Sequence, residues 1–326
     1  MQHMIREIYE QSEILDKILV STRESIGKAN AEIRKARRIF LTGSGTSLHA
    51  AMLYQILLNR TGISPVSIPA SEFHYWFTRG AVFSDSVLIV FSQSGESSDA
   101  LNAAGFGKEL GMTVIGITNG ENSELYELSD IPIFTNAGKE MALAATKSYI
   151  AQITVILESY MLLCNRDLKD SIPVIKSSIR EIFADEENIR DIAGRLGNHV
   201  VFLGSRLLFP TALEGALKMK ESSNTISDGY AIREFIHGPK QVVGNGTSII
   251  LLDGGTTTGE ISMLREFGAS LTDISESPES DIRVPHIDDI LKPILYIVPL
   301  QMIAYYRAIS KGLDPDKPDK LSKVVR

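Results

Sequence analysis

Residues 87–97 read VLIVFSQSGES, an apolar run that changes abruptly into a turn rich in hydroxyl groups. The five apolar residues Val87–Phe91 are typical of a buried strand in a parallel sheet. Good helix formers resume at Asp99, so the polar residues 92–97 are expected to lie where this strand ends and a helix begins. A strand, a tight turn and a helix in this order indicate an α/β fold.

The turn at residues 92–97 combines groups that suit an anion. Three serine hydroxyls, a glutamine amide and the first free N–H groups of the following helix would point above the strand, where the helix dipole also attracts negative charge. The turn lacks the lysine of a Walker loop and the glycine spacing of a dinucleotide fingerprint, which disfavours a nucleoside triphosphate or NAD. We interpret it as a phosphate cradle, although on these residues alone a simple N-capped helix is an equally good interpretation.

The composition sets broad limits on the class of protein. A chain of 326 residues suggests two domains of ordinary size, and 44% apolar with 22% charged residues is typical of a soluble globular protein. The net charge of −7 argues against nucleic acid or an anionic membrane as partner. The single cysteine, Cys164, cannot form an internal disulfide, which indicates a reducing cytoplasm. We expect neither a signal peptide nor a membrane span.

The first half of the chain reads as a doubly wound parallel sheet. Short apolar segments at residues 38–43, 66–68, 113–118 and 131–134 accompany the strand at 87–91, with helical patterns between them. An amphipathic helix is expected to run, with interruptions, from Met4 to about Lys35 and to pack across a sheet or a neighbouring subunit. A further long helix, Ala142–Leu163, would close this domain.

The second half repeats the pattern of the first. Residues 200–205 and a helix over Thr211–Ser223 follow the same strand-Gly-Ser-helix order as residues 39–44 and their helix. Another strand and turn are expected at residues 248–255, with the turn at Gly254 and Gly255, and a weaker strand at 282–285. The helix predicted over Asp288–Lys311 should be kinked or broken at its two prolines, Pro293 and Pro299.

These segments predict two α/β domains related by internal duplication. We expect an N-terminal helix and first domain over residues 1–165, a charged helical linker over 166–195 and a second domain over 196–310. The tail, residues 311–326, is stiffened by proline, and its apolar end indicates that it is tucked against the protein.

Two segments of the second half carry candidate catalytic groups. Glu214, Lys218 and Glu221 lie three or four residues apart, so a helix would place them on related faces, although such a pattern is usually a solvated charge face. His237 precedes a Gly-Pro turn, which would present it on a loop as a proton carrier. The remaining histidines are predicted to be packing residues (His49, His74) or lack the spacing of a metal site (His3, His199, His286).

Together these residues resemble the SIS (sugar isomerase) domain family. The resemblance is greatest to the isomerase half of glucosamine-6-phosphate synthase and to the stand-alone archaeal glucosamine-6-phosphate deaminases. It covers essentially the whole chain through segments whose order and spacing are specific. These segments are Glu7–Gln11, Ser44–Ser47, Ser92–Ser97, Thr146–Lys147, Ala212–Glu221, His237–Pro239 and Lys323–Val325.

The resemblance implies a role for each matching residue. Glu221 would move a proton between carbons 1 and 2 of the sugar, with Lys218 close to it. His237, supplied by the neighbouring subunit of a homodimer, would open the sugar ring, and Lys323 would lie near the carbonyl end. The implied phosphate-binding residues are Ser47, Ser92, Gln93, Ser94 and Ser97. The implied sugar-binding residues are Ser44, Gly45, Thr46, Leu143, Ala145 and Ser322. No redox cofactor or metal is required.

Three positions depart from the synthase and leave the identity of the sugar open. Ser44 replaces a cysteine, Ala145 a serine that touches the sugar, and Arg233 a glycine. The sequence begins at the isomerase half and has only Cys164, so we expect release of ammonia from glucosamine 6-phosphate rather than synthesis from glutamine. A synthase subunit served by a separate glutaminase and a fructosamine-phosphate deglycase stay as alternatives. A noncatalytic sugar-phosphate sensor is the third alternative. Such a sensor could lose Glu221, His237 and Lys323, whereas this chain has all three, and a regulator would usually carry a basic helix-turn-helix segment, which this sequence lacks.

Overall fold

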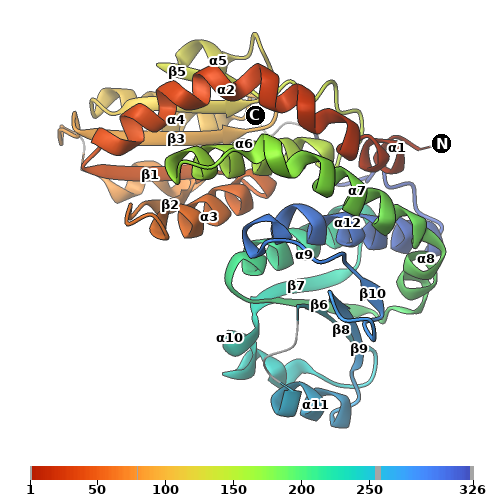
Figure 1. The fold of residues 1–326 in the computed structure, drawn as a ribbon. Coiled ribbons are helices and arrows are strands. Elements are labelled where there is room, and N and C mark those ends of the chain that lie inside the picture. Colours follow the sequence, from red (N-terminus) through yellow and green to blue (C-terminus); the bar gives the residue numbers. More distant parts are fainter. Residues whose placement is uncertain (1, 79, 254–257, 324–326) are drawn as a thin grey trace. The chain divides into compact units, whose positions relative to one another are not determined.

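A computed structural model describes residues 2–78, 80–253 and 258–323, which form two compact units, each built on its own sheet (Figure 1). The β1–β5 unit comprises residues 13–140 and 147–172 and the end of the chain from Ser322. The β6–β10 unit comprises the chain up to Ser12, residues 141–146 and residues 173–321. Each unit therefore combines segments that are distant in the sequence.

The sheet of the β1–β5 unit is parallel, with the strand order β2-β1-β3-β4-β5. Its strands are β1 Arg38–Gly43, β2 Val66–Pro69, β3 Ser86–Ser92, β4 Thr113–Thr118 and β5 Ile131–Phe134. Every residue of β3 is buried, as the apolar run in the sequence predicts for a central strand. The chain proceeds to one side from β1 and to the other side from β3, so the strand order switches between these two strands.

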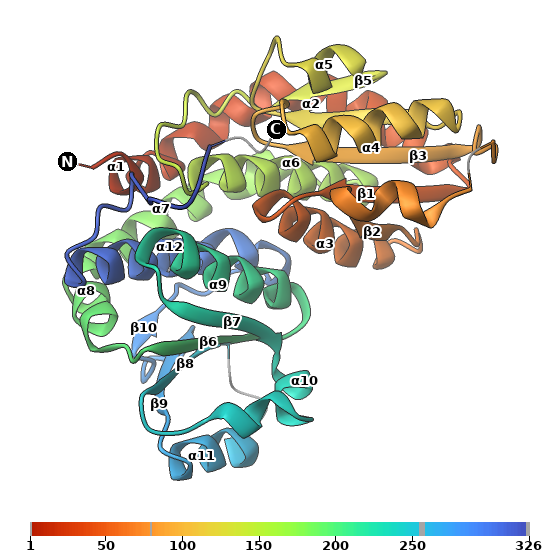
Figure 2. The same ribbon diagram turned by 180° about the vertical axis from the view of Figure 1, so that it is seen from behind.

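Helices cover both faces of this sheet (Figures 1 and 2). Within β3, Ile89 packs toward one layer of helices and its neighbour Leu88 toward the other. The first layer contains α2 Gln11–Lys35, α3 Thr46–Asn59 and α6 Lys147–Leu163, followed by the 3₁₀ helix η2 Leu168–Ser171. The second contains η1 Ala70–Trp76, α4 Ser98–Glu109 and α5 Glu124–Leu128.

The sheet of the β6–β10 unit repeats this topology. Its strands pair in parallel in the order β7-β6-β8-β9-β10, which matches β2-β1-β3-β4-β5 position by position. They are β6 His199–Gly204, β7 Ile226–Ala231, β8 Thr247–Leu252, β9 Ser270–Ser275 and β10 Ile282–Arg283. The prediction of two doubly wound α/β domains with the same architecture is confirmed.

The helices of this unit also lie on both sides of the sheet (Figure 1). One face is covered by α9 Phe209–Ser223 and α12 Lys292–Ser310, and the other by α10 Ile232–Ile236 and α11 Thr258–Glu266. The N-terminal helix α1 His3–Tyr9 contacts α12, and it packs on α7 through an edge-on contact of Tyr9 with Phe183 at a centroid distance of 4.9 Å. The remaining elements are α7 Ile172–Ala184, α8 Glu186–Arg195, η3 Arg206–Leu208, η4 Pro239–Val242 and η5 Asp289–Leu291.

Two observed strands, β7 and β9, are not predicted from the sequence. The edge strand β7 contains Asp228 and Gly229, residue types that are depleted in strands, yet Gly229 is needed because a Cβ there would lie 2.7 Å from the backbone of Leu213. The strand β9 alternates polar and apolar residues too weakly to stand out. The turn predicted at Gly254 and Gly255 lies outside the described residues, as do Val324 and Val325.

One predicted helix start is wrong, and the last helix is not broken at its prolines. The helix expected from Ala142 begins only at Lys147, because the carboxylate of Glu7 accepts the backbone N–H groups of Met141 and Ala142 and holds this segment outside the helix. In the last helix, α12, Pro293 occupies the first turn, where its missing N–H costs no hydrogen bond. The helix α12 continues through Pro299 without a break.

The predicted domain boundaries at residues 165, 195 and 310 stay predictions. Residues 173–195, expected to be a linker, form α7 and α8 of the β6–β10 unit. Among the described residues, no helix combines the length and the apolar character that a membrane span requires.

Candidate active site

The turn between β3 and α4 is held by its own serines. Ser92 Oγ accepts the backbone N–H of Gly95 at 3.1 Å, and Ser94 Oγ accepts that of Glu96 at 3.1 Å. A hydroxyl that accepts one hydrogen bond still has its own proton to donate. Ser97 is the N-cap residue of α4, but its hydroxyl makes no capping hydrogen bond. The turn therefore places three serine hydroxyls at the start of a helix, as the sequence predicts.

Gly95 gives this turn its shape. Its φ of +69° is a left-handed conformation that glycine adopts without strain. A Cβ at this position would lie 2.0 Å from Ser123 Oγ and 2.8 Å from Thr118 Oγ1, and the carbonyl of Gly95 accepts the N–H of Leu125 at 3.0 Å. The turn is thus packed closely against the end of β4 and the start of α5.

A second turn, Ser44–Ser47, follows the neighbouring strand β1. Because β1 and β3 run parallel, with Thr42 beside Val90, the two turns leave the sheet at the same edge. The point between β1 and β3 is the switch in strand order, where open α/β sheets bind ligands. Ser47 is buried in the first turn of α3, and its hydroxyl accepts a hydrogen bond from Gln152 of α6 at 3.0 Å.

In the β6–β10 unit, three charged residues of α9 form a line. Lys218 Nζ lies 3.3 Å from Glu214 Oε1 and also donates to Glu221 Oε2. The side chains of Glu214 and Lys218 are 0% exposed, whereas that of Glu221 is 23% exposed. A solvated charge face is therefore the wrong interpretation of this pattern. Two buried charged groups, Glu214 and Lys218, therefore lie next to a third, Glu221, whose carboxylate is accessible to solvent.

The two carboxylates keep Lys218 protonated. Burial alone would lower the pKa of Lys218, but the negative charges of Glu214 and Glu221 outweigh this effect and raise it. Lys218 is consequently a cation throughout the neutral pH range. Such a group can stabilise negative charge that develops nearby, but it cannot accept a proton.

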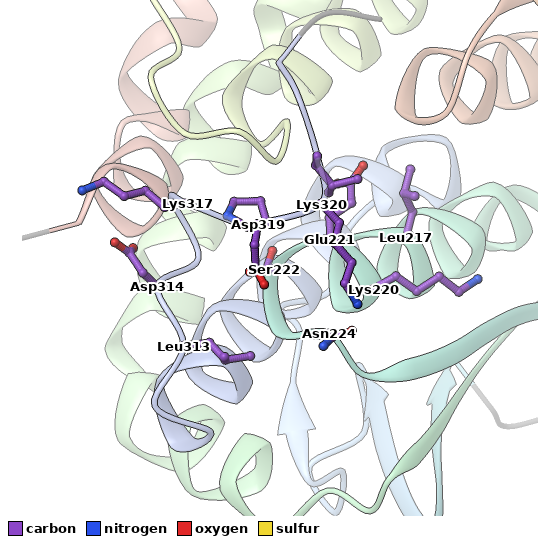
Figure 3. A pocket seen from close by; sticks show the side chains of 12 residues that line it. Leu217, Lys220, Glu221, Ser222, Asn224, Leu313, Asp314, Lys317, Asp319 and Lys320 are labelled. Carbon is purple, nitrogen blue, oxygen red and sulfur yellow. The ribbon is translucent and has the colours of Figure 1, made fainter.

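A pocket of about 360 Å³ lies beside Glu221 (Figure 3). One wall is α9, and the other is the tail that follows α12. Its volume is in the range of pockets that hold small molecules. The lining includes apolar residues (Leu217, Leu313, Pro318, Leu321) and charged ones (Lys220, Asp314, Lys317, Asp319, Lys320). Glu221 therefore faces a partly enclosed space rather than bulk solvent.

His237 lies at the end of a short helix. The strand β7 and the helix α10 precede it, and His237 is the C-cap residue of α10, in the turn that continues into Gly238 and Pro239. The backbone N–H of His237 donates to the carbonyl of Glu234 at 3.1 Å. Its side chain is exposed on the surface of the β6–β10 unit.

Lys323, the last described residue, forms an ion pair with Glu140 in the β1–β5 unit. Lys323 Nζ lies 3.3 Å from Glu140 Oε2, and the side chain of Glu140 is 0% exposed. The same carboxylate accepts hydrogen bonds from the backbone N–H of Ser148 at 3.1 Å and from its hydroxyl at 2.7 Å. Glu140 is not among the predicted site residues, and its one signal in the sequence is a carboxylate before the alanine-rich segment 141–146.

The other predicted sugar-binding residues, and the positions that differ from the synthase, are distributed over both units. Leu143 and Ala145 are half-buried in the segment that Glu7 holds, and Ser322 is exposed beside Lys323. Arg233 of α10 forms an ion pair with Glu260 of α11. The structure thus brings the two serine turns together within the β1–β5 unit, which also contains Lys323. It brings Lys218 and Glu221 together within the β6–β10 unit, which also contains His237.

Residues 32–162 match the family model of the SIS domain, so the chain contains a SIS domain. Over its length it resembles enzymes of amino-sugar phosphates. It is 33% identical over 339 residues to glutamine–fructose-6-phosphate aminotransferase (isomerizing) of Methanothermobacter thermautotrophicus, and 34% identical over 336 residues to that of Sulfolobus acidocaldarius. These matches cover 99% of this chain but 57% and 56% of the relatives, so the chain spans little more than half of their length.

Two solved structures share the fold of the whole chain. The glucosamine-6-phosphate deaminase of Thermotoga maritima has a TM-score of 0.84 at 27% identity, with 99% of both chains covered. The C-terminal domain of glucosamine-fructose-6-phosphate aminotransferase from Francisella tularensis has a TM-score of 0.85 at 26% identity, with 97% of this chain and 98% of that one covered. The similarity therefore extends over both parallel sheets of this chain.

Proposed function

We propose that this protein is a glucosamine-6-phosphate deaminase, which converts glucosamine 6-phosphate and water to fructose 6-phosphate and ammonia. The observation that carries the proposal is the line of charges in α9, where a buried lysine cation lies beside the partly exposed carboxylate of Glu221. The similarity to a glucosamine-6-phosphate deaminase over 99% of both chains supports it.

The proposed chemistry uses Glu221 as a single proton carrier. In the open-chain sugar, Glu221 removes the proton from carbon 2, and the electron pair moves through an enolamine while negative charge develops on the oxygen of carbon 1. The cation of Lys218 stabilises this charge. Glu221 then returns a proton to carbon 1. The imine formed at carbon 2 takes up one water molecule and releases one ammonia, which leaves a ketone. No step needs a redox cofactor or a metal.

The remaining roles follow from the resemblance and belong to the same proposal. His237, supplied by a partner subunit, opens the sugar ring, and Lys323 lies near the carbonyl end. The sugar phosphate is held by the serine turns through Ser47, Ser92, Gln93, Ser94 and Ser97. The sugar itself is contacted by Ser44, Gly45, Thr46, Leu143, Ala145 and Ser322.

Replacing Gly95 with Ala tests the phosphate cradle. The new methyl group would meet Ser123 Oγ and force the turn to shift, so we expect affinity for fructose 6-phosphate, measured by calorimetry, to fall about tenfold or more. Gly62→Ala is the matched control, because Gly62 has a φ of +86° and a methyl group added there would meet no atom within 4 Å. Equal losses in the two variants would reject the turn between β3 and α4 as the phosphate site.

A shared active site predicts that two inactive variants rescue each other. In a homodimer, a Glu221→Gln subunit and a His237→Ala subunit would together contain one intact site. We expect each variant alone to be inactive and the mixture to recover part of the turnover after subunit exchange. Exchange demonstrated by native mass spectrometry without any recovery would contradict a site shared between subunits.

A second candidate reaction is the synthetic direction, from fructose 6-phosphate and ammonia supplied by a separate glutaminase. The similarity to glutamine–fructose-6-phosphate aminotransferases favours it. The protein should therefore be incubated with glucosamine 6-phosphate, with fructose 6-phosphate plus ammonium, and with fructosyl-lysine phosphate. Fastest turnover of the first substrate supports the deaminase, whereas turnover of the second or third alone would replace it with an amination subunit or a deglycase.

A further inference from the structure

The tail that follows α12 is fixed at its base to the helix that carries Glu221. Lys311 Nζ donates to the backbone carbonyls of Ser223 and Asn224 at 2.7 and 2.9 Å, and these carbonyls lie at the end of α9. From this point the tail returns along α9 and forms the second wall of the Glu221 pocket (Figure 3). The shape of the pocket therefore depends on how the tail is held.

Asp316 holds the tail at a second point. A tight turn presents its carboxylate, since Asp314 Oδ1 accepts the N–H of Asp316 at 3.1 Å and the carbonyl of Asp314 accepts that of Lys317 at 3.1 Å. Asp316 Oδ2 then accepts the backbone N–H of His3 at 2.6 Å, and Oδ1 accepts that of Met4 at 2.8 Å. Both oxygens bind residues more than 300 positions earlier in the chain.

The residues that Asp316 binds are themselves attached to α9. The side chain of Met4 is 0% exposed, and its sulfur accepts a hydrogen bond from Ser222 Oγ at 3.5 Å. Ser222 follows Glu221 in the sequence and lines the same pocket. Asp316, the start of α1 and the end of α9 are therefore connected by contacts that reach the pocket-lining residue Ser222.

We propose that Asp316 is a positioning residue, which fixes the tail against α1 and thereby sets the pocket wall that faces Glu221. This inference rests on the proposed function. Only a carboxylate supplies two equivalent oxygens for two N–H donors, and hydrogen bonds to a charged acceptor are the stronger kind. Asp316 does not line the pocket itself, but it lies in the chain between Asp314 and Lys317, which do. Pro318 stiffens the segment that follows, so a change of backbone direction at Asp316 would move the lining residues on that side.

The test compares Asp316→Ala with Asp288→Ala. Asp288 also accepts a backbone N–H in this unit, that of Ile290 at 3.1 Å, but it precedes α12, whereas the tail follows it. In Asp316→Ala we expect amide hydrogen exchange in residues 313–321 to accelerate about tenfold or more, and kcat for glucosamine 6-phosphate to fall about tenfold to a hundredfold. Affinity for fructose 6-phosphate should change less than kcat. Asp316→Asn, which keeps one acceptor oxygen, should lie between Asp316→Ala and the wild type.

We call the contacts of Asp316 with His3 and Met4 the latch. The possible outcomes test the latch and the proposed function independently. Unchanged exchange in Asp316→Ala, or the same acceleration in Asp288→Ala, would overturn the latch. Faster exchange with wild-type kcat would overturn the positioning role. Absence of any turnover in the wild type would overturn the proposed function, whereas the exchange comparison needs no substrate and decides on the latch in either case.

Discussion

Glu221→Gln is expected to lower turnover of glucosamine 6-phosphate by about a hundredfold or more, while its affinity for the sugar phosphate stays close to that of the wild type. The amide is nearly isosteric with the carboxylate but cannot accept a proton, so the transfer from carbon 2 is lost. Steady-state kinetics and calorimetry on the same preparation measure the two effects separately.

Glu187→Gln is the matched control for this variant, because it neutralises an exposed carboxylate in the first turn of α8 of the same unit. We expect its turnover to equal that of the wild type. Near wild-type turnover in Glu221→Gln would mean that Glu221 is only a charge on the surface of α9, and the proposed mechanism would be wrong.

Lys218→Met is expected to lower the free energy of unfolding by about 3 to 5 kcal/mol. The side chain of Glu214 is 0% exposed, and the substitution removes the positive charge 3.3 Å from its carboxylate. The penalty arises from a buried charge that has lost its counter-charge rather than from a lost volume, since methionine is similar in size to lysine. Denaturant unfolding followed by circular dichroism measures the difference.

The double variant Glu214→Gln/Lys218→Met separates charge from packing. Removing the buried negative charge as well should restore part of the stability lost in Lys218→Met. If the single variant costs less than about 1 kcal/mol, or if the double variant is no more stable, the buried ion pair is not what makes Lys218 important to the fold.

The sequence predicts most clearly those strands whose burial produces long apolar runs. In β3, coverage on both faces requires an apolar residue at every position from Val87 to Phe91, and this pattern is visible without a structure. In β7, Asp228 and Gly229 interrupt the pattern because an edge strand is partly exposed and Gly229 must fit against α9. Tertiary packing, not local propensity, decides that strand.

The same distinction applies to the candidate site. The serine turns and the line of charges in α9 are local, because their spacing follows from one turn or one helix. The contacts of Glu140 with Lys323, 183 positions apart, and of Asp316 with the start of α1 depend on segments that meet only in the folded chain. No local sequence pattern predicts such pairs, so the contacts that hold the tail are visible only in the structure.

The most direct test of the account is an ammonia-release assay on glucosamine 6-phosphate, coupled to the detection of fructose 6-phosphate. The account predicts ammonia and fructose 6-phosphate in equal amounts from the wild type, and a rate lower by about a hundredfold or more from Glu221→Gln. The absence of ammonia under conditions where calorimetry shows that the sugar phosphate binds would contradict it.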